Sequence, residues 1–501
     1  MITTIKTSFA QNKSAYLLWG IILLFFIIYG VQAFLNHYFF RTNALDYGFH
    51  LQSMYRFMHF KSGPLTVFGK VLESYFQIHP SFTLLFLTPI NWLLKPLFGS
   101  YTLLLVQNIF LILGGYYTYK VILLKSNNYS LSFLSLIHYF VLWGHFSAIA
   151  FEYIDATIAS TLVPVFFYYF FKEKYWASIL VLFFIISSRE NMPLWFVFIG
   201  MFLGFDNVLN KKSLKWPLRI SIISLLYLIL IFTVLIPGFQ QEGYSYNRFQ
   251  YSSLGANIPE ALLFVLKHPI EAIKLLFVNH LENPVYNNVK AEFWYVFLLS
   301  GGVILIKKPH YLLLFVPIIA QKMFSNDYQM WGINIFYSIE VVSILSIVAF
   351  LILKDIRKSK VRFFAGSMLC LVTFSVTVIK MNARESKWYN KGKEKIYDKN
   401  FYSSQHDIKS IQLVLDQIPK NAKVCASEKL VAHLAFRDHI YYFPNIRDAE
   451  YLILLFNSTT YPLNKVEFDT KVSELINSSE WETMNKTKDL LLMKRVEKKS
   501  Y

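Results

Sequence analysis

The chain is poor in charge and in cysteine. Only 16% of its 501 residues are charged, whereas 55% are hydrophobic and 18% are aromatic. So little charge argues against an ordinary soluble protein of this length and predicts a polytopic membrane protein. Its two cysteines, Cys370 in an apolar run and Cys425 in a polar part of the chain, argue against an intrachain disulfide and exclude a cysteine-based metal site.

Several motifs that mark enzymes and transporters are also missing. The chain contains no glycine-rich phosphate loop, no H-E-x-x-H pair and no G-x-S-x-G elbow, so none of the enzyme classes defined by these motifs is indicated. We detect no internal repeat either, which weakens the case for a transporter built from duplicated halves.

Positive charge is abundant but dispersed. The formal net charge is +18, yet lysine and arginine lie in short loops between apolar runs instead of forming one basic domain or arm. This distribution follows the positive-inside rule of membrane proteins and argues against nucleic-acid binding. The first apolar run, residues 14–35, is long enough to span a membrane and no A-x-A site follows it, so we do not expect a cleaved signal peptide.

Eleven apolar runs predict membrane-spanning helices, at residues 15–36, 101–123, 130–150, 157–171, 176–188, 191–206, 217–237, 291–306, 310–323, 334–353 and 362–380. A twelfth apolar stretch, residues 79–98, is interrupted by Pro80, Pro89, Asn91 and Pro96. If this stretch does not cross, the basic loops share one side with Lys6 and Lys13; they contain Lys125, Lys172, Lys174, Lys211, Lys212, Lys215, Arg219, Lys307, Lys308, Lys354, Arg357, Lys358 and Lys360. We therefore predict a cytoplasmic N-terminus, about eleven spans and a re-entrant or juxtamembrane helix at 79–98.

This topology concentrates polar chemistry on the outer face, which receives Asp46, His50, Glu73, His79, Glu152, Asp155, Arg189, Glu190, Glu242, Arg248, His280, Glu282 and Asp327. Two groups in this set lie at helix ends. The segment FEYIDAT (151–157) joins two spans, and SSREN (187–191) forms the tip of a tight helical hairpin. Ionisable groups at membrane depth are costly unless they pair or line a cavity, so both segments are site candidates.

The composition becomes polar from about Met381 onward, and no further span appears. Apolar runs at 423–427, 439–444, 449–456 and 489–496 predict strands, and residues 406–418 have helical apolar spacing. We predict a transmembrane domain at 1–381, with outer loops 37–100 and 238–290, followed by a small soluble α/β domain at 382–501 on the extracytoplasmic side.

Several short motifs follow one another in a characteristic order. The segment DYGFHLQ (46–52) lies just outside the first span, His79-Pro80-Ser81 opens the interrupted stretch, and an acidic motif follows at 152–155. Later come REN at 189–191 and the tail KVCASEKLVAHLAFRDHIYYFP at 423–444. This order resembles the bacterial and archaeal membrane family called domain of unknown function 2079, which itself looks like the GT-C superfamily of polytopic glycosyltransferases. Leu51 stands where that family has a second aspartate in the first motif.

The resemblance implies a GT-C-like fold and transfer of a sugar from a polyprenyl-phosphate donor at the outer face of the bacterial cytoplasmic membrane. It makes Asp46 the candidate base. Glu152 and Asp155 are candidates for orienting the acceptor or for holding a divalent cation, Mg²⁺ or Mn²⁺. The candidate substrate-binding residues, with the two arginines assigned to the lipid phosphate, are Gln52, His79, Arg189, Glu190 and Arg248.

Each of these roles has a structural alternative. Asp46 could instead cap a juxtamembrane helix that starts near Tyr47. Arg189 and Glu190 could form an internal salt bridge at the hairpin tip. His50 and His79 fit interfacial hydrogen bonding better than metal ligation, because neither has an identifiable co-ligand.

Two other classes of function compete with the enzyme. A transporter or flippase of lipid-linked substrates would place charged groups through the depth of several helices. A non-catalytic lipid-binding or assembly protein is the third possibility, which Leu51 in the first motif keeps open. Glu340, in the outer half of a predicted span, is expected to line a cavity or to be paired. His433 and Arg437 read as structural residues of the soluble domain, with acceptor recognition as the alternative.

Overall fold

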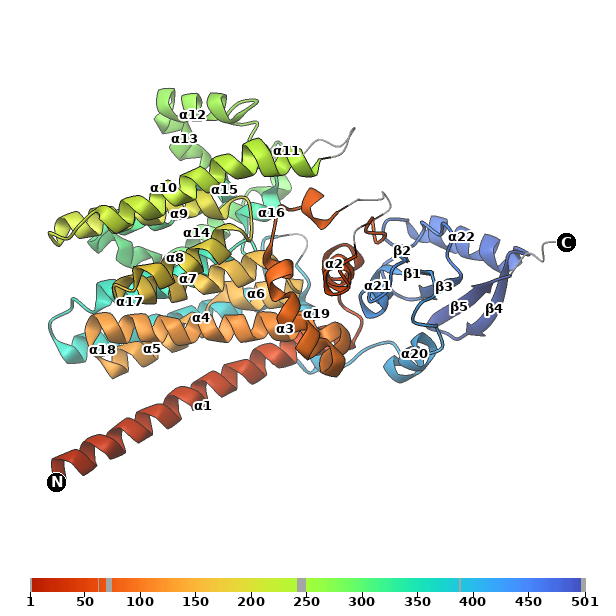
Figure 1. Cartoon of the computed structure of the whole chain (residues 1–501), viewed down its shortest axis with the longest axis horizontal. Coiled ribbons are helices and arrows are strands. Elements are labelled where there is room, and N and C mark those ends of the chain that lie inside the picture. Colours follow the sequence, from red (N-terminus) through yellow and green to blue (C-terminus); the bar gives the residue numbers. More distant parts are fainter. Residues whose placement is uncertain (1, 62, 69–73, 241–248, 387–388, 497–501) are drawn as a thin grey trace. The chain divides into compact units, whose positions relative to one another are not determined.

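A computed structural model describes residues 2–61, 63–68, 74–240, 249–386 and 389–496 (Figure 1). Contacts between residues divide the chain into two compact units. Residues 1–30 and 107–395 form the helical unit, and residues 31–106 and 396–501 form the mixed unit. The mixed unit therefore combines most of the predicted outer loop 37–100 with the C-terminal part of the chain.

Six helical segments among the described residues are long and apolar enough to cross a membrane, which confirms the prediction of a helical membrane protein. They are Ser14–Tyr38, Thr83–Ser126, Tyr129–Phe151, Met192–Leu209, Lys215–Phe239 and Ser359–Asn382. Three shorter apolar helices cover Asp155–Phe171, Tyr175–Ile186 and Ile339–Leu353. The count of eleven spans stays a prediction.

The helical unit contains most of the helices. After the first part of α1 (Ile2–Tyr38) come α4 (Thr102–Ser126), α5 (Tyr129–Val141), α6 (Trp143–Phe151), α7 (Asp155–Phe171), α8 (Tyr175–Ile186), α9 (Met192–Leu209), α10 (Lys215–Leu230) and α11 (Ile236–Phe239). The outer segment and the last helices follow as α12 (Ile258–Lys267), α13 (Pro269–Leu275), α14 (Val289–Leu299), α15 (Val316–Met323), α16 (Tyr328–Trp331), α17 (Ile339–Leu353), α18 (Ser359–Asn382) and α19 (Lys391–Glu394).

Helix α17 forms the centre of this unit. It is apolar on all sides, and every one of its 15 residues is buried, as expected for a helix surrounded by other helices. It packs against α5 and α7, and α5 in turn packs against α18 (Figure 1). By contrast, α10 keeps Leu218, Ile222 and Leu226 exposed, which suits a surface that meets lipid.

The runs predicted at 291–306 and 310–323 do not form continuous α-helices. Helix α14 ends at Leu299, and two 3-10 segments, Gly302–Lys307 and Pro309–Leu314, precede the short α15. Gly301 has a φ of 116°, a conformation that L-residues with side chains rarely adopt and that ends the helix. Pro309 removes a backbone donor and has the same effect.

The interrupted stretch at 79–98 contains α3 (Thr83–Phe98), a helix of 16 residues. Gly99, with a φ of 52° and a ψ of −130°, and a 3-10 turn over Gly99–Tyr101 separate it from α4. Helix α3 packs against α2 (Phe49–Met58), and the indole Nε1 of Trp92 donates to the carbonyl of Met58 at 2.9 Å. A 16-residue helix is shorter than the roughly 20 residues a span requires, so α3 remains a candidate juxtamembrane helix.

The rest of the mixed unit is a five-stranded sheet with three helices. The strands are β1 (Val424–Ala426), β2 (Ile440–Tyr442), β3 (Tyr451–Leu455), β4 (Trp481–Lys486) and β5 (Leu490–Arg495), in the order β2-β1-β3-β5-β4. Strand β1 pairs in parallel with β2 and β3, while β5 is antiparallel to β3 and β4. The helices are α20 (Ile408–Leu415), α21 (Glu428–Leu434) and α22 (Lys465–Asn477). The four strands and the helix predicted here are confirmed, and β4 was missed because its side chains are mostly exposed.

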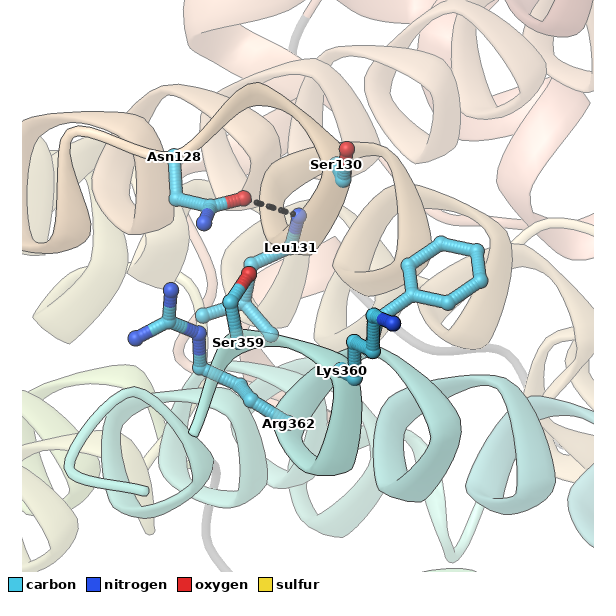
Figure 2. A pocket seen from close by; sticks show the side chains of 7 residues that line it. Asn128, Ser130, Leu131, Ser359, Lys360 and Arg362 are labelled. Carbon is cyan, nitrogen blue, oxygen red and sulfur yellow. Dashed lines mark hydrogen bonds between the residues drawn. The ribbon is translucent and has the colours of Figure 1, made fainter. Parts of the chain in front are cut away.

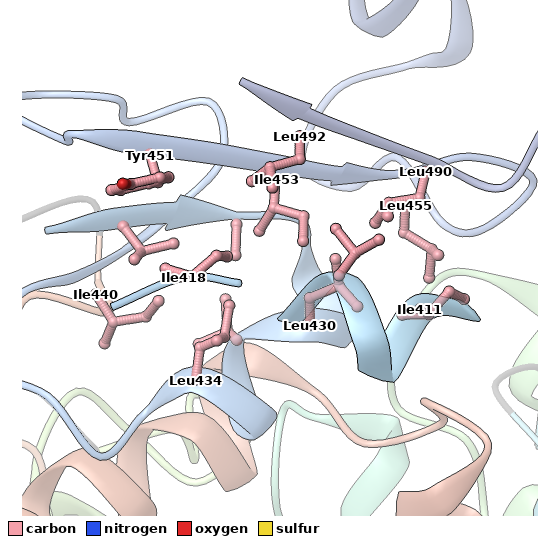
Figure 3. Close-up of a cluster of buried hydrophobic side chains, with 14 of the residues drawn as sticks. Ile411, Ile418, Leu430, Leu434, Ile440, Tyr451, Ile453, Leu455, Leu490 and Leu492 are labelled. Carbon is pink, nitrogen blue, oxygen red and sulfur yellow. The ribbon is translucent and has the colours of Figure 1, made fainter. Parts of the chain in front are cut away.

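Side chains alternate across the sheet and build two cores. On one face, Ile440, Ile453 and Leu492 pack with residues of α20 and α21, such as Ile411 and Leu430 (Figure 3). This core also contains Phe40, Ala44 and Val67 from the segment that follows α1. On the other face, side chains of α22 cover Cys425, Leu452 and Leu491. Residues 31–106 thus supply part of the hydrophobic core of the sheet.

Candidate functional site

The turn between α6 and α7 carries two of the predicted site residues. Helix α6 ends at Phe151 and α7 begins at Asp155. Glu152, between them, is buried and has a φ of 106° and a ψ of −155°, a backbone conformation almost restricted to glycine. Residues held in such conformations cluster at functional sites, where the surrounding structure compensates for the strain.

The side chain of Gln107 on α4 supplies this compensation. Its Nε2 donates to the carbonyl of Glu152 at 2.7 Å, and its Oε1 accepts from the backbone N–H of Ile154 at 2.9 Å. One buried amide therefore pairs with the backbone on both sides of Tyr153. Because both partners are buried peptide groups, these hydrogen bonds hold the turn in place.

Both carboxylates of the turn have partners in the protein. The Nζ of Lys393 in α19 lies 3.2 Å from Oε1 of Glu152. The hydroxyl of Tyr153 donates to Oδ1 of Asp155 at 2.7 Å, and Asp155 occupies the first turn of α7, where a negative charge interacts favourably with the helix dipole.

Further cations reach this region from the last turn of α18 and from the segment that follows it. Lys380 forms an ion pair with Glu292 at 2.9 Å, and Arg384 pairs with Glu394. The same guanidinium donates through Nη1 to Ser147 on α6 at 3.0 Å. Burial raises the pKa of Glu394, and the charge of Arg384 opposes that rise.

Sequence reasoning missed Lys393, Arg384 and Gln107. A signal for the two cations was present: in the predicted topology, the chain just after the last span lies outside, where the positive-inside rule disfavours lysine and arginine. Basic residues at such a position therefore indicate a specific role, and here Lys393 and Arg384 pair with the buried acids Glu152 and Glu394.

The hairpin tip at 187–191 is linked to the same turn through an aromatic ring. The guanidinium of Arg189 lies over the ring of Phe336, 5.1 Å from its centroid, and that ring is 4.9 Å from the ring of Phe151. Asn191 donates through Nδ2 to Oε1 of Gln321 at 2.9 Å. Arg189 therefore lies on a ring that also contacts the residue preceding Glu152.

One further acid and a tyrosine lie near this hairpin. Glu340, in the first turn of α17, is buried and interacts electrostatically with Arg189 and Lys322. Burial, and after it the charge of Glu190, raises the pKa of Tyr251 to about 12. Tyr251 belongs to the predicted outer loop 238–290, so the hairpin tip and part of that loop share one environment.

The other predicted site residues belong to the mixed unit. Asp46 is half-buried inside a single π turn, Ala44–Gly48, and its carbonyl oxygen is 2.7 Å from Nδ1 of His50. The residue before this turn is Asn43, so Asp46 does not occupy the N-cap position that the structural alternative assigned to it. His79 is half-buried and follows the 3-10 turn Tyr75–Gln77.

Gln52 is fully buried and its amide is occupied by the protein. Nε2 donates to the hydroxyl of Thr66 at 2.8 Å and to the carbonyl of Asp438 at 3.2 Å. Oε1 accepts from the backbone N–H groups of Thr66 and Val67. These bonds join α2 to the residues around Val67 and to the start of β2, which favours a structural role for Gln52 over contact with substrate.

Two residues of the tail motif make contacts within the protein. Arg437 donates to the carbonyls of Leu434 and Ala422, and His433 stacks on His37 with ring centroids 3.9 Å apart. Both side chains help to join residues within the mixed unit.

The structure thus places Glu152, Asp155 and Arg189 in the helical unit, with Arg189 linked to the turn through Phe336, and Asp46, Gln52 and His79 in the mixed unit. Arg248 lies outside the described residues. Within the described part of the chain, no three His, Cys, Asp or Glu side chains cluster as a metal site requires. Because Glu152 already pairs with Lys393, the turn as it stands does not fit a divalent cation.

Comparison with known proteins gives one family. The family model described as "Predicted membrane protein (DUF2079)" matches residues 36–495. The resemblance noted from the short motifs is thereby confirmed at the level of this family. No curated protein matches the chain.

Proposed function

The chain belongs to the DUF2079 family of predicted membrane proteins, and on this premise we propose that it is an integral-membrane glycosyltransferase. It would transfer a sugar from a polyprenyl-phosphate donor to an acceptor on the outer face of the bacterial cytoplasmic membrane, with the N-terminus inside and the C-terminal domain outside. The observation that carries this proposal is the strained turn at Glu152, which is held by Gln107 and paired with Lys393.

Transfer from a lipid-linked phosphate needs a base for the acceptor hydroxyl, positive charge for the departing phosphate and an apolar surface for the prenyl chain. Asp46 is the proposed base. Glu152 and Asp155 would orient the acceptor, and Arg189 would bind phosphate, since a guanidinium matches its oxygens. The proposed substrate-binding residues also include Arg248, Glu190 and His79. A role for Mg²⁺ or Mn²⁺ is not part of this mechanism.

The competing transporter hypothesis depends on charge at depth within the helices. Lys322 on α15 is a candidate for such a charge, because it falls in the predicted span 310–323 and its side chain is buried. However, its Nζ donates to the carbonyls of Met330, Gly332 and Tyr337 at 2.6 to 3.0 Å. These three hydrogen bonds give the buried ammonium group of Lys322 a structural role, so Lys322 does not support the transporter hypothesis.

Two isosteric substitutions test the enzyme proposal. In a strain that lacks the protein, Asp46→Asn and Glu152→Gln should each fail to restore the cell-surface glycan. The first variant loses the proposed base, which contributes about 10²- to 10⁴-fold to a rate, and the second loses the carboxylate proposed to orient the acceptor. Asp469→Asn is the matched control, since the Asp469 carboxylate pairs with Lys465 on the exposed surface of α22. All variants should accumulate in the membrane to the same level.

Mass spectrometry of lipids that co-purify with the intact protein provides the second arm. We expect a polyprenyl phosphate or its glycosylated form. A normal glycan in both the Asp46→Asn and the Glu152→Gln strain would refute catalysis, and a bound prenyl lipid combined with that result would favour the non-catalytic lipid-binding protein.

A further inference from the structure

A cavity of about 310 Å³ lies between the beginnings of α5 and α18 (Figure 2), and neither Glu152 nor another residue of its turn lines it. Its lining combines polar, apolar and cationic side chains. The residues that line it are Asn128, Ser130 and Leu131 from the start of α5, and Ser359, Lys360, Arg362 and Phe363 from the start of α18.

The two helices hold this cavity in a fixed shape. Helices α5 and α18 pack along each other, and Cys370 and Thr377 of α18 donate to the carbonyls of Leu134 and Val141 on α5. Gly366 permits the close approach, because a Cβ there would lie 3.0 Å from Leu134. At the mouth, Oδ1 of Asn128 accepts from the N–H of Leu131 at 2.9 Å and fixes the start of α5 (Figure 2).

The cavity carries surplus positive charge. Within the part of the chain that the structure describes, no acidic side chain forms an ion pair with Lys360 or Arg362. The acid close in sequence, Asp355, pairs instead with Lys308 at 2.6 Å and with Lys354 at 2.8 Å. Arg362 donates through Nη1 to the carbonyls of Lys354 and Ile356, which orients its guanidinium at the cavity.

The position of the cavity identifies the kind of anion. Helix α18 and the segment Tyr129–Phe151 are both candidate membrane spans, and the cavity lies at an end of each. Phospholipid head groups occupy this depth, with acyl chains beginning one or two turns further along the helix. Phe363 and Phe364 are exposed at that distance along α18, so apolar surface continues directly from the cationic cavity.

We propose that this cavity binds the phosphodiester of an anionic phospholipid, with Lys360 and Arg362 on the phosphate oxygens. Ser130 and Ser359 are placed to meet polar atoms of the head group, while Leu131 and Phe363 meet the first carbons of the acyl chains. In the predicted topology this end of both helices is cytoplasmic, so the lipid comes from the inner leaflet. The site is separate from the proposed glycosyl transfer and does not depend on it.

Thermal unfolding of the full-length protein in a neutral detergent tests the proposal. Short-chain phosphatidylglycerol should raise the unfolding temperature, whereas phosphatidylcholine of the same chain length and inorganic phosphate should not. Lys360→Gln should weaken the apparent affinity for phosphatidylglycerol about tenfold, since a lysine near an anionic head group contributes on that order. Lys358→Gln is the matched control, because it removes the same charge from an exposed residue that does not line the cavity.

Each alternative result contradicts the proposal in a defined way. Equal stabilisation by the two lipids would exclude a phosphate-specific site. Equal stabilisation by inorganic phosphate would identify the ligand as free phosphate instead of a lipid. If Lys358→Gln and Lys360→Gln weaken the apparent affinity for phosphatidylglycerol equally, the basic surface attracts anions non-specifically and the cavity is not a binding site. Arg362→Gln is a second variant of the same cavity. If it fails to fold, the comparison of Lys360→Gln with Lys358→Gln still decides the outcome.

Discussion

Glu152 stands in a backbone conformation that only glycine adopts freely. This strain predicts a difference between two variants that both lack the carboxylate. Glu152→Gly should be more stable than Glu152→Ala by about 1 kcal/mol, because relief of about 1 to 3 kcal/mol of strain exceeds the entropic penalty of glycine. Chemical unfolding in detergent measures the difference. Equal stabilities, or a more stable alanine variant, would show that the turn is not strained.

The ion pair between Glu152 and Lys393 is the second residue-scale feature. Lys393→Met should destabilise the protein by about 3 kcal/mol, since it leaves a buried carboxylate without its cation. The double variant Glu152→Gln with Lys393→Met should recover much of this loss, which gives a coupling of about 1 to 3 kcal/mol. Additive effects of the two substitutions would mean that the pair contributes nothing to stability.

His280 predicts a dependence of stability on pH. Burial, and then the charge of Lys290 at 3.0 Å, lowers the pKa of His280 from 6.5 to about 4. Between pH 6.5 and pH 4, His280 is therefore protonated in the unfolded chain but neutral in the folded one. The free energy of unfolding falls as the pH drops through this range, and His280 contributes no further loss below pH 4. Hydrogen exchange of peptides covering 276–290, corrected for intrinsic rates, should accelerate over this range. His280→Asn should remove the effect, and an unchanged profile in that variant would assign it to another group.

At this scale the sequence identified acids but not their partners. Glu152 and Asp155 could be singled out because they interrupt apolar runs. Gln107 and Lys393 lie far away in sequence, and no local pattern connects them to the turn. For the same reason Gln52 was assigned to substrate, although its amide is used within the fold.

The packing of neighbouring elements explains the glycine in the first motif, DYGFHLQ (46–52). A Cβ on Gly48 would lie 2.8 Å from Cγ1 of Val431 on α21, so the π turn that carries Asp46 packs directly on that helix. Gly48→Val should destabilise the mixed unit by about 1 to 3 kcal/mol through overpacking. Hydrogen exchange in residues 428–434 should report the loosening.

A compensating substitution makes this test specific. Val431→Ala removes the side chain that a larger residue 48 would meet, so the double variant Gly48→Val with Val431→Ala should be more stable than Gly48→Val alone. If the double variant is instead less stable than both single variants, the contact between the π turn and α21 is not what makes glycine necessary.

Helices and strands followed from the sequence where a single physical pattern governed them. The run at 362–380 became part of α18 because nothing interrupts its helical hydrogen bonding. The run at 334–353 forms α17 only from Ile339 onward, since residues 334–338 are bends and turns and Ile335 has a φ of 55°. The prediction of two continuous helices at 291–306 and 310–323 was wrong. Hydrophobicity alone does not show that Gly301 and Pro309 divide these runs into short helices and 3-10 segments.

At the scale of the whole molecule, the division into two units was the part that composition could not reveal. Residues 37–100 look like a loop between membrane helices, yet Phe40, Ala44 and Val67 complete the core of a sheet that begins at Val424. Such a contact spans most of the chain, and only a folded structure brings its members together. The unit that carries Asp46 is therefore defined by both ends of the sequence.

The predicted orientation rests on the basic loops and can be tested directly. In intact cells, Lys125→Cys should resist a membrane-impermeant thiol reagent, because the positive-inside rule keeps its loop in the cytoplasm. Lys267→Cys, on the exposed surface of α12 in the predicted outer loop, is the control that should react. Both native cysteines are buried, so the unmodified protein should give little background. Labelling at residue 125 with none at residue 267 would invert the topology, and the acids of the turn at Glu152 would then face the cytoplasm, where a transfer at the outer face is impossible.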